Sequence, residues 1–196
     1  MSRLTIIVAA TKSNGIGQNG TLPWRLPKEM AYFARATANA PEGSSNAVIM
    51  GRNTWESIPV KFRPLKNRSN IVVSRNASYD VGSAKLESGL QAAIKRMNYE
   101  KNARGFIIGG ASLYAESLAL TPSSAVGFVD RILLTRIVSP AFDECDVFMP
   151  DFLGGTSEWK RATHDALEAW VGFEVAEGVQ TENGIEYEFQ MWVREP

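Results

Sequence analysis

Short apolar runs rich in β-branched residues alternate with helix-like segments along the chain, and this alternation limits the possible fold more than any other feature. Strands are predicted at Leu4–Ala10, Ala47–Met50, Asn70–Ser74 and Phe106–Ile108. Helices are predicted at Lys28–Thr37, Asn53–Ile58, Gly89–Met97 (capped by Ser88) and Ala111–Leu118. This order is typical of the α/β class, in which a mostly parallel central sheet is flanked by helices.

The C-terminal part of the chain follows a different pattern. After a predicted strand at Arg131–Val138, apolar and polar residues alternate in Gly172–Val179 and Ile185–Val193. Asn183-Gly184 stands between these two runs, and Asn-Gly favours a tight hairpin turn. We therefore expect an antiparallel hairpin at the C-terminal edge of the sheet. The 196 residues suit a single domain. Surface connections are predicted at Ala38–Asn46, Leu120–Asp130 and Pro140–Pro150.

The charge balance and the scarcity of cysteine and histidine exclude several kinds of function. Basic and acidic residues number 21 each, so nucleic acid and anionic membranes are not expected as partners. Cys145 has no second cysteine to pair with, and no secretion signal or apolar span is evident, so a cytoplasmic location is expected. His164, the single histidine, is interpreted as a surface residue, and no metal site is expected.

Two turns combine glycine with the start of a predicted helix. Gly51 and Gly109-Gly110 each follow a predicted strand, at the sheet edge where α/β proteins bind ligands. Arg52 lies in the first turn, and Ser74-Arg75 follows the neighbouring predicted strand. These side chains could hold an isolated phosphate such as the 2′-phosphate of NADPH. Ordinary surface arginines remain an equal alternative.

The stretch Gly15–Gly20 fits the G-x-G-x-x-G pattern of dinucleotide-binding proteins. That pattern has a physical basis only where a strand leads directly into it and a helix opens from it. Here Thr11–Asn14 intervenes, and Pro23 and Pro27 follow closely, which disfavours a helix. We therefore interpret Gly15–Gly20 as a flexible surface loop.

Two charged residues are candidates for ligand contacts. Glu29 flanks a predicted apolar stripe formed by Leu26, Met30 and Phe33, so it could have a raised pKa or bind a cationic group. The alternative, a carboxylate that favours the helix dipole in the first turn, has the stronger support from sequence alone. The basic loop that ends at Arg68 could bind an acidic substrate tail, although a solvated connector is the simpler interpretation.

Several stretches, in order along the chain, resemble the dihydrofolate reductase family of the eukaryotic, fungal type. They are Asn14–Gly17, Leu22–Trp24 with Glu29 and Phe33, Val48–Pro59, Arg63–Leu65, Val72–Arg75, Ile107–Tyr114 and Leu134–Arg136. Together they span most of the chain. The resemblance places Gly15–Gly20 at the start of the family's mobile active-site loop, so the match to the dinucleotide pattern is a coincidence.

The resemblance implies an NADPH-dependent oxidoreductase that reduces 7,8-dihydrofolate and supports one-carbon metabolism and thymidylate synthesis. Glu29 would be the active-site carboxylate, Thr135 would bond to Glu29 or to the amino group of the pterin, and Trp24 would help fix a water. Arg68 would bind the glutamate tail of the substrate. Further substrate contacts are implied for Val8, Ala9, Leu22, Met30, Phe33, Ile58, Leu65, Ile108 and Tyr114. A cytoplasmic monomer that binds antifolate inhibitors is expected.

The same resemblance implies a set of NADPH contacts. Ala10 and Ile16 would flank the nicotinamide, and Gly109-Gly110 would be joined by a cis peptide. The other cofactor residues would be Gly51, Arg52, Asn53, Thr54, Val73, Ser74, Arg75, Ala111, Ser112 and Leu113. Some positions depart from common family patterns, among them Met30, Arg25–Pro27 and Phe62, which bears on inhibitor selectivity and substrate affinity rather than on the reaction.

Two alternatives remain at this point. A reductase of the same fold could act on a pyrimidine intermediate of riboflavin synthesis, but Glu29, Trp24 and Arg68 argue against it. A non-catalytic NADPH-binding or sensor protein would have no need for Glu29.

Overall fold

The computed structural model describes residues 2–154 and 158–195, and the chain divides into two compact units. Unit 1 contains Thr37–Val129 and the first residues up to Thr5. Unit 2 contains Ile6–Ala36 and the chain from Asp130 onward. Strands β1 (Ser2–Thr11) and β7 (Gly127–Ser139) run from one unit into the other. The single domain expected from chain length stays a prediction.

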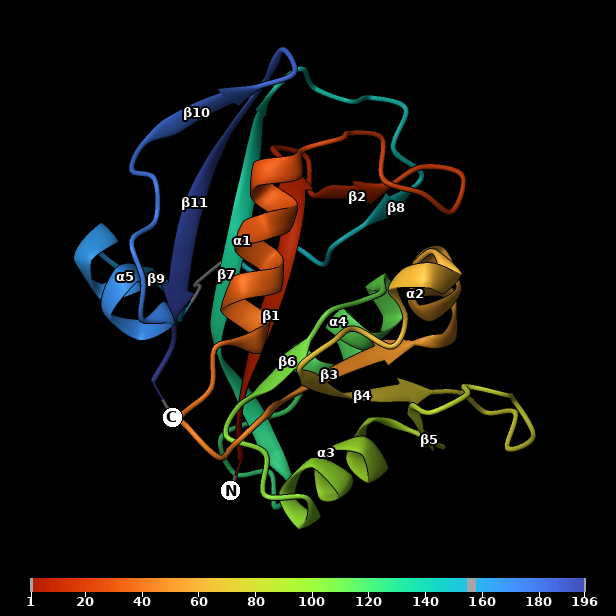
Figure 1. Ribbon diagram of the computed structural model, residues 1–196. Helices are drawn as coiled ribbons and strands as arrows, with labels where there is room; N and C mark the ends of the chain where they lie inside the picture. The colour runs from red at the N-terminus through yellow and green to blue at the C-terminus, as the bar shows by residue number, and fades with distance from the viewer. Residues whose placement is uncertain (1, 155–157, 196) are drawn as a thin grey trace. The chain divides into compact units, whose positions relative to one another are not determined.

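Unit 1 is built on parallel strands, as the alternation of strands and helices predicted (Figure 1). The order across the sheet is β6 (Gly105–Ile107), β3 (Asn46–Gly51), β4 (Arg68–Val73) and β5 (Lys85–Glu87). Its helices are α2 (Arg52–Ser57), the 3-10 turn η1 (Val60–Phe62), α3 (Leu90–Tyr99) and α4 (Ala111–Leu118). Helix α3 packs against β4 and β5, and α4 packs against β6.

The core of unit 1 explains why its strands are nearly continuous apolar runs. Ile49, Ile71 and Ile107 are completely buried, as expected for parallel strands that are covered on both faces. Helix α3 buries Leu90, Ile94 and Met97, which confirms the predicted apolar face. The predicted cap at Ser88 is wrong, because the helix begins one residue later and Gly89 occupies the cap position.

Unit 2 contains the antiparallel strand pairs that the C-terminal hairpin forms. Its strands lie in the order β10 (Val179–Glu182), β11 (Ile185–Val193), β7 and β1, and β9 (Lys160–Arg161) pairs with β11. A second small sheet pairs β2 (Gly15–Gly17) with β8 (Val147–Phe148). The helices are α1 (Pro27–Ala38) and α5 (His164–Val171). The predicted mostly parallel sheet, flanked by helices and ending in an antiparallel C-terminal hairpin, is thus confirmed.

The C-terminal hairpin is confirmed, but its first strand is shorter than predicted. Asn183 and Gly184 have φ values of 51° and 73°, as a two-residue turn of this type requires. The strand predicted at Gly172–Val179 is wrong, since β10 begins only at Val179. Gly172 instead ends helix α5 in the left-handed conformation, and the N–H of Val175 bonds to the Glu168 side chain. The backbone N–H groups of Gly172 and Val175 thus form hydrogen bonds with Glu168 of α5 and not with a neighbouring strand.

The predicted apolar stripe before and along helix α1 is only partly correct, because Leu26 is buried and Phe33 is half-buried but Met30 is exposed. Glu29, Tyr32 and Ala36 are buried, whereas Met30 is 49% exposed. The Tyr32 ring selects this face, because it packs on the Phe189 ring of β11 at a centroid distance of 4.2 Å. Glu29 therefore lies within the buried face and not at its margin, while Met30 is left as an apolar side chain on the surface.

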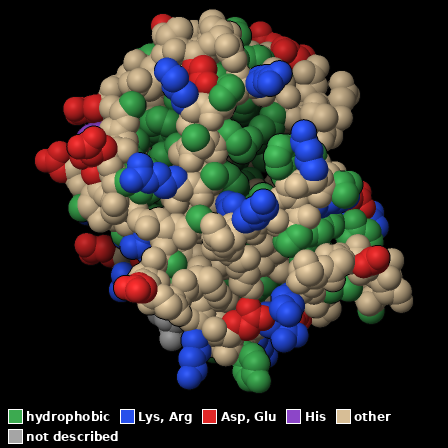
Figure 2. Space-filling view, viewed as in Figure 1, with side chains coloured by type: hydrophobic (Ala, Val, Ile, Leu, Met, Phe, Trp, Pro, Cys, Tyr) green, Lys and Arg blue, Asp and Glu red, His purple; other side chains and the backbone are tan. Residues whose placement is uncertain are grey.

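Charged side chains of both signs are interspersed over the face of the molecule shown in Figure 2. Equal totals of 21 basic and 21 acidic residues agree with this picture. Among the helices of the described residues, none has the length and apolar character needed to cross a lipid bilayer.

Candidate active site

Unit 2 places a carboxylate and a threonine side by side in a buried position. The hydroxyl of Thr135, on β7, donates to Oε1 of Glu29, on α1, at 2.9 Å. Glu29 is 7% exposed and Thr135 is 1% exposed. The two residues lie 106 positions apart in the chain. The contact implied by the family resemblance is therefore present.

Burial controls the protonation of Glu29. Loss of water contacts raises the pKa of Glu29 from 4.5 to about 7, because the charged carboxylate is poorly solvated there. The hydrogen bond from Thr135 lowers this pKa, and the like charge of Glu182 raises it further. This direction agrees with the raised-pKa interpretation of Glu29, the one that the sequence alone favours less, and Glu29 also lies in the first turn of α1, as the alternative expects.

Three residues that the sequence did not single out surround this carboxylate. Glu182 accepts a hydrogen bond from the phenol of Tyr187 at 3.0 Å. Burial together with the negative charge of Glu29 raises the pKa of Tyr32, and burial with the charges of Glu182 and Glu29 raises that of Tyr187. No local sequence signal identifies Tyr32, Tyr187 and Glu182 as neighbours of Glu29, because their proximity arises from strand pairing and helix packing.

The loop that begins at Gly15 is partly a strand, which corrects the interpretation of Gly15–Gly20 as a surface loop throughout. The N–H of Gly15 bonds to the Thr11 hydroxyl, and a Cβ at Gly15 would lie 2.7 Å from Cβ of Cys145. Arg136 donates to the carbonyl of Thr11 and to the side chain of Asn14. Helix α1 begins only at Pro27, so Gly15–Gly20 does not form the N-terminus of a helix.

Trp24 is buried, and its ring packs edge-on against Phe142. Among the described residues its indole N–H has no hydrogen-bond acceptor. A buried donor of this kind is usually satisfied by an ordered water or a ligand.

In unit 1, the two predicted glycine turns lie next to each other. The N–H of Gly51 donates to the carbonyl of Gly109 at 2.9 Å. Gly109 has a φ of 123°, and a Cβ there would lie 3.2 Å from the Thr54 hydroxyl and 3.3 Å from that of Tyr114. The Gly109–Gly110 peptide is cis, as the family resemblance implied. Helix α4 begins after Gly110 without a side-chain cap, so its first backbone N–H groups face no capping side chain.

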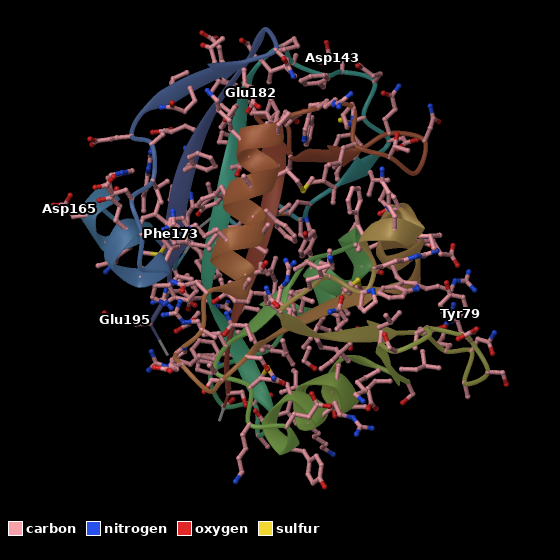
Figure 3. All side chains as sticks on the ribbon, viewed as in Figure 1. Tyr79, Asp143, Asp165, Phe173, Glu182 and Glu195 are labelled. Atoms are coloured by element: carbon pink, nitrogen blue, oxygen red, sulfur yellow. The ribbon has the colours of Figure 1, made fainter. Side chains whose placement is uncertain are left out.

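The predicted phosphate-binding side chains share one sheet edge. Gly51 of β3 is paired with Val73 of β4, so Arg52 and Ser74 directly follow paired residues. Arg75 is exposed. Arg52 lies 3.6 Å from Glu56, four residues later in α2, and its guanidinium is 5.7 Å from the Tyr79 ring centroid. Figure 3 shows Tyr79 in the loop that follows β4.

Arg68 is held in a fixed position within unit 1. Its Nη1 donates to the Thr37 hydroxyl and its Nε donates to the carbonyl of Lys66, both at 2.8 Å. Partial burial lowers the pKa of the guanidinium. Nearby, the side-chain oxygen of Asn70 accepts a hydrogen bond from the N–H of Leu65 and holds the loop that leads to Arg68. These bonds show that the Arg68 side chain is oriented and that the segment which carries it is not a loose connector.

The other residues implied by the resemblance differ in exposure. Val8, Ala10, Gly109, Leu113 and Tyr114 are buried, and Leu22, Met30, Arg52, Asn53 and Ser112 are exposed. The remainder are half-buried: Ala9, Ile16, Phe33, Gly51, Thr54, Ile58, Leu65, Val73, Ser74, Ile108, Gly110 and Ala111. The exposed part of the half-buried apolar side chains is available for contact with a flat ring. His164, expected at the surface, is half-buried and bonds to the carbonyl of Val175.

Comparison with known proteins gives a consistent result. The family model described as dihydrofolate reductase matches residues 3–194. A dihydrofolate reductase of Cryptococcus neoformans is 44% identical, over 97% of this chain and 94% of its own. A dihydrofolate reductase of Pneumocystis carinii is 43% identical, over 98% of this chain and 97% of its own. The structure of Schistosoma mansoni dihydrofolate reductase aligns with a TM-score of 0.80 at 35% identity, covering 99% of both chains.

Near-complete coverage of each relative means that the similarity is not confined to a few motifs. The residues matched by the family model include Glu29, Thr135 and both glycine turns. Enzymes of this family are folate-reducing oxidoreductases that use a nicotinamide cofactor. On the combined evidence of fold, site and similarity, this chain belongs to the dihydrofolate reductase family.

Proposed function

We propose that this protein reduces 7,8-dihydrofolate to 5,6,7,8-tetrahydrofolate, with hydride arriving at C6 of the pterin and a proton at N5. The observation that carries the proposal is the buried Glu29, bonded to Thr135, with a pKa raised to about 7. Such a carboxyl group holds its proton near neutral pH, where a general acid is most effective. Membership of the family supports the choice of substrate.

In unit 2, Glu29 would form hydrogen bonds with the 2-amino group and N3 of the pterin. It would also promote protonation at N5 through a water. Thr135 holds the Glu29 carboxyl group in one orientation. The buried indole N–H of Trp24 is suited to fix the water. Met30 and Phe33, which α1 leaves outside the core, offer apolar surface to the ring system. In unit 1, Arg68 is assigned to the glutamate tail as an oriented guanidinium.

The cofactor that we propose is NADPH, which supplies the hydride from C4 of its nicotinamide when bound. The glycine turns fit this role, because Gly109 has a φ of 123°, which side chains disfavour, and a residue without a side chain leaves its backbone open to close approach. The backbone N–H groups at the start of α4 suit the pyrophosphate. We assign Ala10 and Ile16 to the nicotinamide, and Arg52, Ser74 and Arg75 to the 2′-phosphate.

Replacing Arg75 with alanine tests the assignment of the 2′-phosphate. A charge-assisted contact contributes about 1.5 kcal/mol, so the affinity for NADPH should fall about tenfold while that for NADH stays the same. Fluorescence titration with both cofactors measures this difference. Lys95→Ala, which removes an exposed charge from α3, is the matched control. Equal losses for NADPH and NADH would contradict a contact with the 2′-phosphate.

The overall proposal is tested by following NADPH oxidation by absorbance, with and without dihydrofolate, with NADH in parallel. We expect oxidation only when dihydrofolate is present, and much faster oxidation of NADPH than of NADH. Binding of NADPH without turnover would refute the proposed substrate. Pyrimidine intermediates of riboflavin synthesis would then be the substrates to screen, and the absence of any turnover would favour a sensor protein.

A further inference from the structure

The turn of the C-terminal hairpin holds the chain segment that leads into Glu29. Glu182, the last residue of β10, accepts a hydrogen bond from the backbone N–H of Lys28 at 2.8 Å. Asn183, the next residue, donates from its side chain to the carbonyl of Arg25 at 2.9 Å. The hairpin therefore contacts the chain on both sides of Pro27, where α1 begins, and Figure 3 shows Glu182 at this end of the helix.

Glu182 acts as a helix cap supplied from another part of the chain. The first backbone N–H groups of a helix have no partner within it, and a carboxylate near them is stabilised by the helix dipole. Glu29 lies one residue after Lys28, so a contact to the Lys28 N–H constrains the backbone that carries Glu29.

The carboxylate of Glu182 is itself held in place. Its second oxygen accepts the hydrogen bond of Tyr187 at 3.0 Å, and Tyr187 is 1% exposed. Strand β11 pairs Phe189 with Thr135 of β7, and Tyr187 is two residues earlier on the same strand. The strand register that positions Thr135 therefore positions Glu182 as well.

We propose that Glu182 is a positioning residue of the active site, which fixes the first turn of α1 and presents a second negative charge to Glu29. Among the residues that the structure describes, the titratable groups that interact with Glu29 are Tyr32 on its own helix, and Glu182 and Tyr187 on the hairpin. The charge of Glu182 raises the pKa of Glu29, in the same direction as burial. Glu182 thus keeps Glu29 protonated to higher pH.

This inference depends on the proposed role of Glu29 in the reaction, and the experiment separates the two. The rate of hydride transfer is measured in single turnovers from pH 5 to pH 9.5, with NADPH and dihydrofolate, for the wild type and four variants. Glu182→Gln removes the charge and keeps the size. Glu182→Asp keeps the charge. Glu186→Gln removes the charge of an exposed carboxylate on the same hairpin, which bonds to Ser139. Glu29→Gln tests the proposed function itself.

For Glu182→Gln we expect the midpoint of the pH profile to fall by about half a unit. A shift of this size is expected when one like charge is removed from the neighbourhood of Glu29, in protein that is partly hydrated. The rate should therefore be about threefold lower above pH 8 and unchanged below pH 6. Glu182→Asp and Glu186→Gln should keep the wild-type midpoint. Thermal unfolding of each variant verifies that it is folded.

An equal loss of rate at every pH in Glu182→Gln, with an unmoved midpoint, would show a purely structural role and overturn the inference. A midpoint that moves equally in Glu186→Gln would overturn it too, because the effect would then belong to net charge. In both cases an inactive Glu29→Gln leaves the proposed function standing. A fully active Glu29→Gln would refute the proposed function and this inference with it.

Discussion

Replacement of Glu29 by glutamine is expected to slow hydride transfer by a factor of about 10²–10³ at pH 7, in the lower part of the range of about 10²–10⁴ that a positioned general acid contributes. The amide keeps the size of the side chain and an acceptor for the Thr135 hydroxyl. It has no proton to supply near neutral pH, and it cannot accept from both the amino group and N3 of the pterin as a carboxylate does. Stopped-flow absorbance of NADPH in single turnovers measures the rate.

The binding of NADPH provides the control for this variant. The residues assigned to the adenosine and its phosphates lie in unit 1, whereas Glu29 lies in unit 2. The dissociation constant for NADPH should therefore stay within about twofold of the wild type, an energetic difference below 0.5 kcal/mol. The rate in the variant should also lose the pH dependence that the wild type shows around pH 7. A rate close to that of the wild type would exclude Glu29 from proton transfer.

The same variant is expected to be more stable than the wild type at alkaline pH. In the unfolded chain Glu29 ionises at about pH 4.5, whereas in the folded protein it ionises at about pH 7. Between these values the folded state binds the extra proton, so the free energy of unfolding falls as pH rises. The loss begins near pH 4.5 and is complete above pH 7, where the shift corresponds to about 3 kcal/mol. Glutamine does not ionise and avoids this loss.

Urea unfolding of ligand-free protein at pH 4 and pH 8 measures the effect. At pH 8 we expect Glu29→Gln to unfold with a free energy about 3 kcal/mol higher than that of the wild type. At pH 4 the two should agree within about 0.5 kcal/mol, because Glu29 is then protonated in both states. Glu186→Gln, which removes an exposed charge, should show no such difference between the two pH values. A gain of equal size at both pH values would show that packing, not ionisation, is responsible.

These two expectations have opposite signs, and the same burial causes both. A carboxyl group taken from water destabilises the folded protein at neutral pH, and it gains a pKa that suits proton transfer. Active sites commonly retain groups that cost stability in this way. A variant with higher stability and lower activity would show that Glu29 is retained for chemistry.

Much of the fold could be predicted because the signals are local. The apolar runs around Ile49, Ile71 and Ile107 became buried parallel strands, and Asn183-Gly184 became the hairpin turn. The strand predicted at Gly172–Val179 failed, because Glu168 of α5 bonds to the backbone of Val175. Alternation of residue types does not reveal that a distant side chain will satisfy the backbone of a segment.

The candidate site shows a similar division. The sequence predicts Glu29 as a carboxylate beside apolar residues, and it predicts the burial of Leu26 correctly but not the exposure of Met30. Spacing alone allowed Leu26, Met30 and Phe33 to face the core. Packing of Tyr32 on Phe189, which follows from strand β11, decided the orientation.

The strand and helix order, the hairpin turn and the glycine turns after β3 and β6 follow from local sequence, because each depends on residues close together in the chain. Which groups act on Glu29 depends instead on long-range packing. Thr135 is 106 positions away, and Glu182 contacts a backbone N–H 154 positions away. The pKa of Glu29 results from burial, one hydrogen bond and one like charge. All three arise when α1 packs on strands from the other end of the chain, and no local pattern contains that information.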